Sequence, residues 1–284
     1  MFFSIIITCY NEGQDVLSAV RSAQAQTFHD YEIIVVKDYS NHQPTLEVCR
    51  LLQNEGIQVL YAERNVGVSV TRNMGIAVAK GDIIYTLDGD DVLPPVALAI
   101  IADTFDKYPE ADVVFGNYAL IEGDIQKIVD CSLLVDETNI LRIDKYLSCG
   151  VLPVGQNATR KRVAIEYPSS ERYSFGCQDF ELQLRMLEHG VKFIYTPHVL
   201  YQWYRKPTGI NSSQRNAKSL DVCMYEHIET VAPYIGHRYL LGLCKENHDT
   251  IRYRHYFAQY APFYLRWAKY LPMSILTKLS CFIK

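Results

Sequence analysis

The sequence of 284 residues lacks any long apolar run, since no stretch approaches the roughly 18–20 consecutive apolar residues of a membrane-spanning helix. Its first residues, MFFSIIITCYNE, have neither the basic segment nor the small-residue cleavage site of a signal peptide. The eight cysteines form no Cys-x-x-Cys pair, and the eight histidines show no metal-ligand spacing. These absences argue against a membrane span, a disulfide framework and a zinc site, and we expect a cytoplasmic protein.

An excess of positive charge is also missing. The chain carries 28 Lys and Arg against 32 Asp and Glu, a formal net charge of −4, which excludes a generally basic nucleic-acid-binding protein. The distribution is uneven, because residues 235–284 carry a net charge of +6 and residues 1–234 a net charge of −10. We therefore expect an anionic surface as a partner of the basic end.

The first 118 residues alternate short apolar runs with helical patterns. Strands are predicted over 3–8, 32–36, 58–61, 82–87 and 112–117, and helices over 14–24, 45–53, 69–79 and 95–107. This alternation is typical of an α/β sandwich with a mostly parallel central sheet. Ligands of such sheets bind beyond the carboxyl ends of the strands.

The alternation weakens after residue 118. Helices are predicted over 136–147 and 181–189, and a strand over 192–196. The remainder is rich in Tyr, Arg and Lys and is predicted to be mainly helical. We divide the chain into a first half of the domain (1–118), a second half (119–215) and a helical, basic, aromatic tail (216–284).

Polar residues gather where the predicted strands end. They are Thr8, Tyr10 and Glu12 after the first strand, Asp38 after the second, and Asp88 and Asp90 after the fourth. In a parallel sheet these positions share one edge, where a Tyr ring can stack on a base and two carboxylates can hold Mg²⁺ or Mn²⁺ with phosphate oxygens. Each residue alone is more often a turn, cap or packing residue. Together they indicate a nucleotide-diphosphate site.

Three segments of the chain resemble the family 2 inverting glycosyltransferases of the GT-A fold: SIIITCYNE, EIIVVKDYSN and RNVGVSVTRNMGIAVAKGDIIYTLDGDDVLP. The likeness covers roughly residues 2–118 and continues more weakly through SFGCQDFELQLRMLEHG (174–190) and YQWYR (201–205). The resemblance implies a GT-A type α/β/α sandwich. It also implies transfer of a sugar by a single displacement with inversion at the anomeric carbon.

The resemblance assigns roles to the residues at the strand ends. Thr8, Tyr10 and Glu12 match positions that line the nucleotide pocket, and Asp38 matches the position that contacts the uracil. Asp88 and Asp90 match the family's Asp-x-Asp. Asp88 is then expected near the ribose and the metal, and Asp90 is expected to bind Mn²⁺ or Mg²⁺ directly. Asp91 is expected to cap the following turn.

Asp179 is the candidate catalytic base, because it stands where the family commonly has the Asp of Gly-Glu-Asp. A carboxylate within hydrogen-bond reach can take the proton of an acceptor hydroxyl as the new bond forms. A second interpretation stays open, since Asp179 also begins an apolar-periodic helix, where Asp is a favoured cap. Both can be true.

Four basic residues are candidates for contacts with the donor. We expect Arg64 to face the nucleotide and Arg72 to form an ion pair at a helix start. Many family members carry a metal-binding His shortly after the 201–205 segment, but the window 199–213 has none. Arg205 and Lys206 could neutralise the diphosphate instead, or lie in a solvated basic loop.

Three positions depart from the family pattern. Lys37 and Tyr39 replace the first Asp and the Gly of Asp-Asp-Gly-Ser, and Gln178 replaces the Glu before the base. A cation at position 37 could alter the contacts to the base or the ribose. A neutral side chain at position 178 could change the preference for the acceptor.

The tail carries aromatic residues at helical spacing, interrupted at Pro262. They are Tyr253, Tyr256, Phe257, Tyr260, Phe263, Tyr264 and Trp267, with Arg252, Arg266 and Lys269 nearby. Such a face either binds an anionic membrane surface or docks on the catalytic domain or a second subunit.

The expected function is metal-dependent transfer of one sugar, by a hexosyl- or N-acetylhexosaminyltransferase, from a UDP-sugar to a saccharide acceptor. By analogy the acceptor is lipid-linked and belongs to a bacterial capsule, O-antigen or lipooligosaccharide, at the inner face of the cytoplasmic membrane. One alternative is a nucleotidyltransferase, although residues 9–14 lack its Gly-rich basic loop. Another is a non-catalytic subunit that binds nucleotide or carbohydrate.

Overall fold

The computed structural model describes residues 1–149, 157–174, 176–206, 214–260 and 269–280. The chain forms two compact units, Met1–Asn216 and Ala217–Lys284, which we describe separately.

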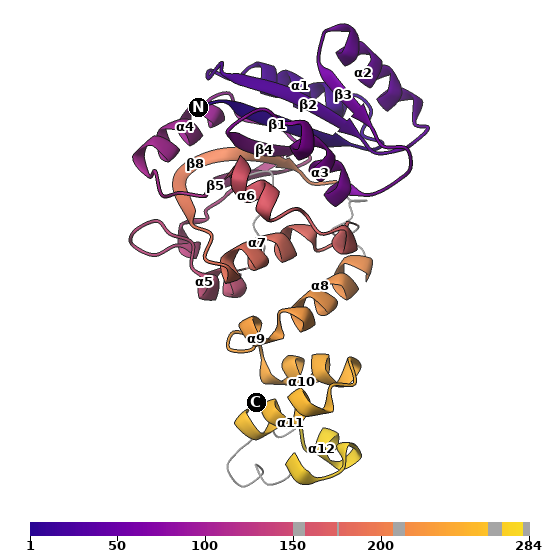
Figure 1. Ribbon diagram of the computed structural model, residues 1–284, viewed down its shortest axis with the longest axis vertical. Helices are drawn as coiled ribbons and strands as arrows, with labels where there is room; N and C mark the ends of the chain where they lie inside the picture. The colour runs from indigo at the N-terminus through magenta and orange to yellow at the C-terminus, as the bar shows by residue number, and fades with distance from the viewer. Residues whose placement is uncertain (150–156, 175, 207–213, 261–268, 281–284) are drawn as a thin grey trace. The chain divides into compact units, whose positions relative to one another are not determined.

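The first unit is built on an eight-stranded sheet (Figure 1). Four neighbouring strands run parallel in the order β3 (Gln58–Tyr61), β2 (Tyr31–Lys37), β1 (Phe3–Cys9) and β4 (Ile83–Asp88). The sheet continues through β7 (Asn157–Arg160) and β5 (Val113–Glu122) to β6 (Ile125–Val129), with antiparallel pairing at each step. The last strand, β8 (Phe193–Tyr204), pairs parallel with β5. The predicted mostly parallel α/β fold is confirmed.

Every residue of β1 is buried, and successive side chains of a strand point to opposite sides of the sheet. Both faces of the sheet are therefore covered, and helices cover them. Ile5 and Ile7 pack in one core with α1 (Asp15–Gln24), α2 (Gln43–Asn54) and α4 (Ala97–Lys107). Ile6 packs in the other core with α3 (Val68–Val78) and α6 (Lys161–Glu166). The result is the predicted three-layer sandwich.

The predicted elements of the first 118 residues are all present, with ends that shift by one to a few residues. The second half differs more. The helix predicted over 136–147 is reduced to α5 (Ile143–Cys149), because the Asp136 carboxylate accepts the N–H groups of Thr138 and Ile140 and folds that segment into a turn. Strands β6 and β7 were not predicted, and β8 continues eight residues beyond the strand expected over 192–196.

The second unit is helical, with α8 (Gln214–Glu226) leading into α9 (Ile228–Val231), α10 (His237–Glu246), α11 (Thr250–Tyr260) and α12 (Met273–Leu279). Tyr253, Tyr256 and Phe257 are buried in its own core beside residues of α9, α10 and α12. These three residues therefore pack within the second unit itself, whereas the sequence offered a membrane surface, the catalytic domain or a second subunit as the partner of their face. The rest of that expected face, from Pro262 to Trp267, lies outside the described residues. Within the part of the chain that the structure describes, no helix has the length and apolar content to cross a membrane.

Candidate active site

The parallel register of the sheet brings the ends of β1, β2 and β4 together. Thr8 in β1 pairs with Asp88 in β4, and Cys9 pairs with Lys37 in β2. The Thr8 hydroxyl lies 3.4 Å from Oδ1 of Asp88 and donates to it. The expected polar edge at the carboxyl ends of the strands is therefore present.

Arg72 joins this edge to the second half of the domain. Its side chain is fully buried in α3, where Nη2 lies 2.8 Å from Oδ1 of Asp88 and Nη1 lies 2.7 Å from Oδ1 of Asp179. Burial alone would lower the pKa of the guanidinium, but the charges of Asp88 and Asp179 outweigh it and raise the pKa above its ordinary value. The expected ion pair exists, but Arg72 is the fifth residue of α3 and pairs with two carboxylates, those of Asp88 and Asp179.

Asp179 lies in the first turn of α7 (Gln178–Glu188). Cys177 is the N-cap, with a left-handed backbone at φ 64°, so the alternative that Asp179 is the N-cap residue is wrong. Acidic side chains are favourable in the first turn of a helix, so Asp179 suits this position. Its side chain is 24% exposed, which leaves it accessible to an acceptor.

Asp90 faces a lysine and an acidic neighbour. Its carboxylate lies 3.2 Å from Nζ of Lys206, which also binds Asp15 at 2.8 Å. Burial and then the nearby charge of Asp88 raise the pKa of Asp90, and Lys206 opposes this shift. Burial acts to lower the pKa of Lys206, but Asp15 and Asp90 outweigh it and raise that pKa.

The carboxylate oxygens of Asp88 and Asp90 are of the kind that a hard divalent cation binds. The side chains of Asp88 and Asp90 are 37% and 32% exposed, and two carboxylates completed by phosphate oxygens and water are what Mg²⁺ usually binds. Among the residues described by the structure, no group of three or more His, Cys, Asp or Glu side chains gathers as a metal site. A cation here would depend on the diphosphate for part of its coordination.

Asp91 does not have the role that was expected. Instead of capping the next turn, its buried carboxylate accepts the Tyr201 hydroxyl and the backbone N–H of Tyr204, the latter at 2.8 Å. Burial and then the charges of Asp88 and Asp90 raise the pKa of Asp91 to about 8. Asp91 thus anchors the end of β8 beside the site, a long-range contact that no local sequence signal could reveal.

The remaining predicted nucleotide residues differ in their surroundings. The Tyr10 ring is 40% exposed, and the Glu12 carboxylate accepts the Tyr10 backbone N–H. Burial raises the pKa of Glu12. Asp38 is buried at the end of β2 and is bound by backbone N–H groups.

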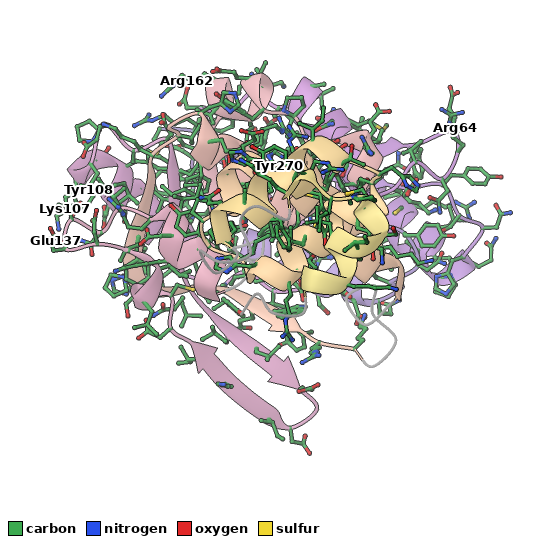
Figure 2. All side chains as sticks on the ribbon, turned by 90° about the horizontal axis from the view of Figure 1, so that it is seen from below. Arg64, Lys107, Tyr108, Glu137, Arg162 and Tyr270 are labelled. Carbon is green, nitrogen blue, oxygen red and sulfur yellow. The ribbon has the colours of Figure 1, made fainter. Side chains whose placement is uncertain are left out.

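Two of the predicted basic residues, Arg64 and Arg205, make no recorded contact with Asp88 or Asp90 in the described part of the chain. Arg64 is exposed, and its side chain projects outward from its loop (Figure 2). Arg205 lies with Nε 3.9 Å from Glu122, at the end of β5. Lys206 is therefore the basic residue of that pair that reaches Asp90.

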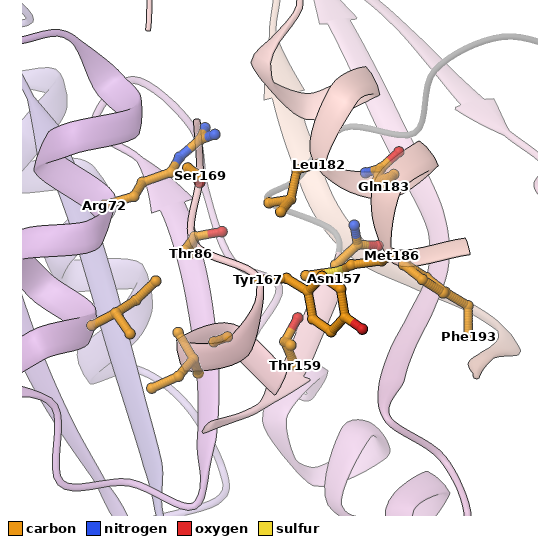
Figure 3. A pocket seen from close by; sticks show the side chains of 13 residues that line it. Arg72, Thr86, Asn157, Thr159, Tyr167, Ser169, Leu182, Gln183, Met186 and Phe193 are labelled. Carbon is orange, nitrogen blue, oxygen red and sulfur yellow. The ribbon is translucent and has the colours of Figure 1, made fainter. Parts of the chain in front are cut away.

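Arg72 also lines a small cavity together with Thr86, Asn157 and mostly apolar side chains of α6, α7 and β8 (Figure 3). Nε of Arg72 and Oδ1 of Asn157 are buried and have no hydrogen-bond partner within the described part of the chain. Buried polar groups of this kind are commonly satisfied by internal water.

Two comparisons with known sequences are informative. Glycosyltransferase GlyG of Streptococcus pneumoniae is 33% identical over 117 residues, which cover 40% of this chain and 38% of that protein. An uncharacterized glycosyltransferase of Haemophilus influenzae is 28% identical over 237 residues, covering 80% of this chain and 78% of that protein. The chain thus spans less than two fifths of the length of GlyG.

The fold is similar to that of Staphylococcus aureus TarS 1-349 in complex with UDP-GlcNAc. The TM-score is 0.66 at 17% sequence identity, over 100% of this chain and 82% of that one. Residues 4–166 match the model of a family described as glycosyl transferase family 2. The predicted family is confirmed: this chain belongs to glycosyl transferase family 2.

Proposed function

We propose that this protein is a metal-dependent, inverting glycosyltransferase that moves one sugar from a UDP-sugar to a saccharide acceptor. The observation that carries the proposal is the Arg72 guanidinium, which binds Asp88 and Asp179 at 2.8 and 2.7 Å. One planar guanidinium thus binds both Asp88, a candidate for donor binding, and Asp179, the candidate base. TarS binds UDP-GlcNAc, which favours a UDP-sugar as the donor of this related fold.

The residues have distinct roles in this reaction. Asp88 and Asp90 would hold Mn²⁺ or Mg²⁺, which supplies stabilisation of negative charge on the leaving diphosphate. Asp179 takes the proton of the acceptor hydroxyl while that oxygen attacks the anomeric carbon. The bond from the anomeric carbon to the diphosphate oxygen breaks as the new glycosidic bond forms, and UDP leaves. Arg72 fixes the position of the Asp179 carboxylate through the contact at 2.7 Å.

Thr8, Tyr10, Glu12 and Asp38 form the nucleotide side of the proposed site. Their support is the shared edge at the ends of β1 and β2, next to Asp88. Lys206 would neutralise the diphosphate, and its distance of 3.2 Å from Asp90 supports this role. Arg64 and Arg205 have no such geometric support.

The test is a screen of UDP-sugars for UDP release with Mn²⁺, repeated with saccharide and lipid-linked acceptors. We expect transfer to stop on chelation and in Asp90→Asn. Transfer that survives both treatments would refute the metal-dependent mechanism. Binding of UDP and Mn²⁺ without transfer to any acceptor would instead favour a non-catalytic subunit.

We also propose a lipid-linked acceptor of a bacterial surface glycan, such as a capsule, O-antigen or lipooligosaccharide, at the inner face of the cytoplasmic membrane. The basic second unit supports contact with an anionic bilayer. In that unit Tyr270, which is labelled in Figure 2, is 80% exposed, and the Lys269 ammonium lies 5.1 Å from the centre of its ring. Ile275 and Lys278 are exposed in α12.

Sedimentation with anionic vesicles tests this membrane contact. Tyr270→Ser combined with Ile275→Ser should reduce the bound fraction, whereas Ile251→Ser, at an equally exposed residue of α11, should not. Equal binding of all variants would exclude this patch as the membrane contact.

A further inference from the structure

Lys37, which stands where the family pattern has an Asp, is not available to a ligand. Its side chain is buried, and Nζ donates to the Asp38 carbonyl at 3.1 Å and to the carbonyl and hydroxyl oxygens of Ser40, both at 2.9 Å. An ammonium group has three N–H donors, so all of them are used. The Lys37 ammonium can therefore alter contacts to the base or the ribose only through the loop that it holds.

The Asp38 carboxylate is likewise bound by groups of the protein itself. Oδ1 accepts the backbone N–H groups of Tyr39 and Val66, both at 2.9 Å, and Oδ2 accepts that of Gly67 at 2.8 Å. Three of the roughly four acceptor positions of a carboxylate are thus occupied. The buried Asp38 mainly ties the end of β2 to the segment before α3.

These bonds hold Tyr39 from both sides. Lys37 binds the carbonyls of Asp38 and Ser40, which flank Tyr39 in the chain. The Ser40 hydroxyl in turn donates to the Tyr10 carbonyl at 2.8 Å, which joins this loop to the loop after β1. Within Lys37–Ser40, Tyr39 is the residue that is exposed, at 49%, and Tyr10 on the adjoining loop is 40% exposed.

We infer that Tyr39 is a binding residue that contacts the nucleobase of the donor, with the exposed Tyr10 on the adjoining loop. The inference rests on the proposed function. An aromatic ring on a fixed loop offers a stacking surface, and fixing the ring beforehand reduces the conformational entropy that binding costs. Lys37 acts as a positioning residue, because its bonds hold the backbone that carries the ring.

Calorimetric titration of the full chain with UDP and Mn²⁺ tests the inference. We expect Tyr39→Leu to weaken UDP binding by about 5- to 150-fold, the range that follows from the loss of one base–aromatic stack, and Tyr39→Phe to bind nearly as the parent does. Inorganic pyrophosphate with Mn²⁺ is the matched probe, because it lacks a base. Its affinity should be the same in all three proteins.

Two results would overturn the inference. Tyr39→Leu could bind UDP as tightly as the parent, or it could lose UDP and pyrophosphate to the same extent, which would indicate general damage. If the parent itself binds no UDP, the proposed function fails instead, so the two failures are distinguishable.

A double-mutant cycle tests the role of Lys37. Lys37→Met should weaken UDP binding in the parent, and this effect should shrink in the Tyr39→Leu background, because the ring that Lys37 positions is then absent. An equal effect in both backgrounds would mean that Lys37 does not act through Tyr39. If Lys37→Met does not fold, the Tyr39 variants still decide the main inference.

Discussion

The Arg72 guanidinium lies 2.7 Å from the carboxylate of Asp179, a residue 107 positions later in the chain. The same group lies 2.8 Å from Asp88. One buried cation therefore connects the donor side of the proposed site to the candidate base on α7. This connection makes Arg72 the first residue to change in a test of the site.

Replacement of Arg72 should affect both stability and turnover. Arg72→Met leaves Asp88 and Asp179 without their shared cation, and because both carboxylates are partly exposed the cost should be about 1–3 kcal/mol. Arg72→Lys keeps the charge but cannot bind both carboxylates as a fork, so turnover should fall more than UDP affinity. Urea unfolding and UDP release measure the two effects.

Arg21→Met is the matched control for this prediction. Arg21 forms an exposed ion pair with Glu55 at 2.6 Å, and such pairs contribute little to stability. If Arg72→Met were as stable and active as the Arg21 variant, the central role of Arg72 would be refuted.

Asp179→Asn should separate binding from chemistry. The amide keeps the size of the side chain but cannot take a proton, so we expect kcat to fall by roughly 10²- to 10⁴-fold while UDP still binds. UDP release gives kcat, and the rise in melting temperature with UDP and Mn²⁺ reports binding. Asp144→Asn, at an exposed carboxylate of α5, should leave both unchanged. Turnover of Asp179→Asn near that of the parent would mean that another group is the base.

Lys206→Met should weaken UDP binding more than UMP binding. Lys206 reaches the edge of the site at Asp90, so its charge should favour the second phosphate of UDP, by up to about fivefold for a partly exposed pair. The ratio of the UDP and UMP dissociation constants is the measurement. Arg205→Met is the control, because Arg205 lies near Glu122 and should leave that ratio unchanged.

Asp91 should make stability depend on pH. Its pKa is about 8 in the folded chain against an ordinary value of 3.8, so the unfolded chain releases this proton at a much lower pH. The free energy of unfolding should therefore fall as pH rises from about 4 to about 8, by an amount on the order of a few kcal/mol from this residue, and level off above. Asp91→Asn should remove this part of the fall, as measured by urea unfolding at several pH values. A parent and variant with parallel pH profiles would contradict the prediction.

Local patterns were sufficient for the first half of the domain. The apolar run of β1 predicts a strand buried on both faces, and the strand Gln58–Tyr61 has the predicted bounds. A parallel sheet then brings the ends of these strands to one edge, whereas the structure gives the neighbours and the register that set Thr8 beside Asp88.

Local patterns were insufficient where a side chain is defined by a distant partner. Lys37 resembles a free cation in the sequence, but three oxygen atoms of its own loop use its donors. Asp91 resembles a turn cap, but Tyr201 and Tyr204 bind it from β8. The aromatic spacing of α11 resembles a membrane-binding face, but Tyr253, Tyr256 and Phe257 form the core of the second unit.

The sequence by itself determined the α/β sandwich and the group of polar residues at the strand ends, because these depend on periodicity and on spacing within short segments. The family was indicated by the resemblance of three segments to its known members. Only the tertiary structure decided which charges meet. Arg72 could be paired with Asp179 only once α3 and α7 were packed beside the same edge, since an ion pair depends on distance in space and not on separation along the chain.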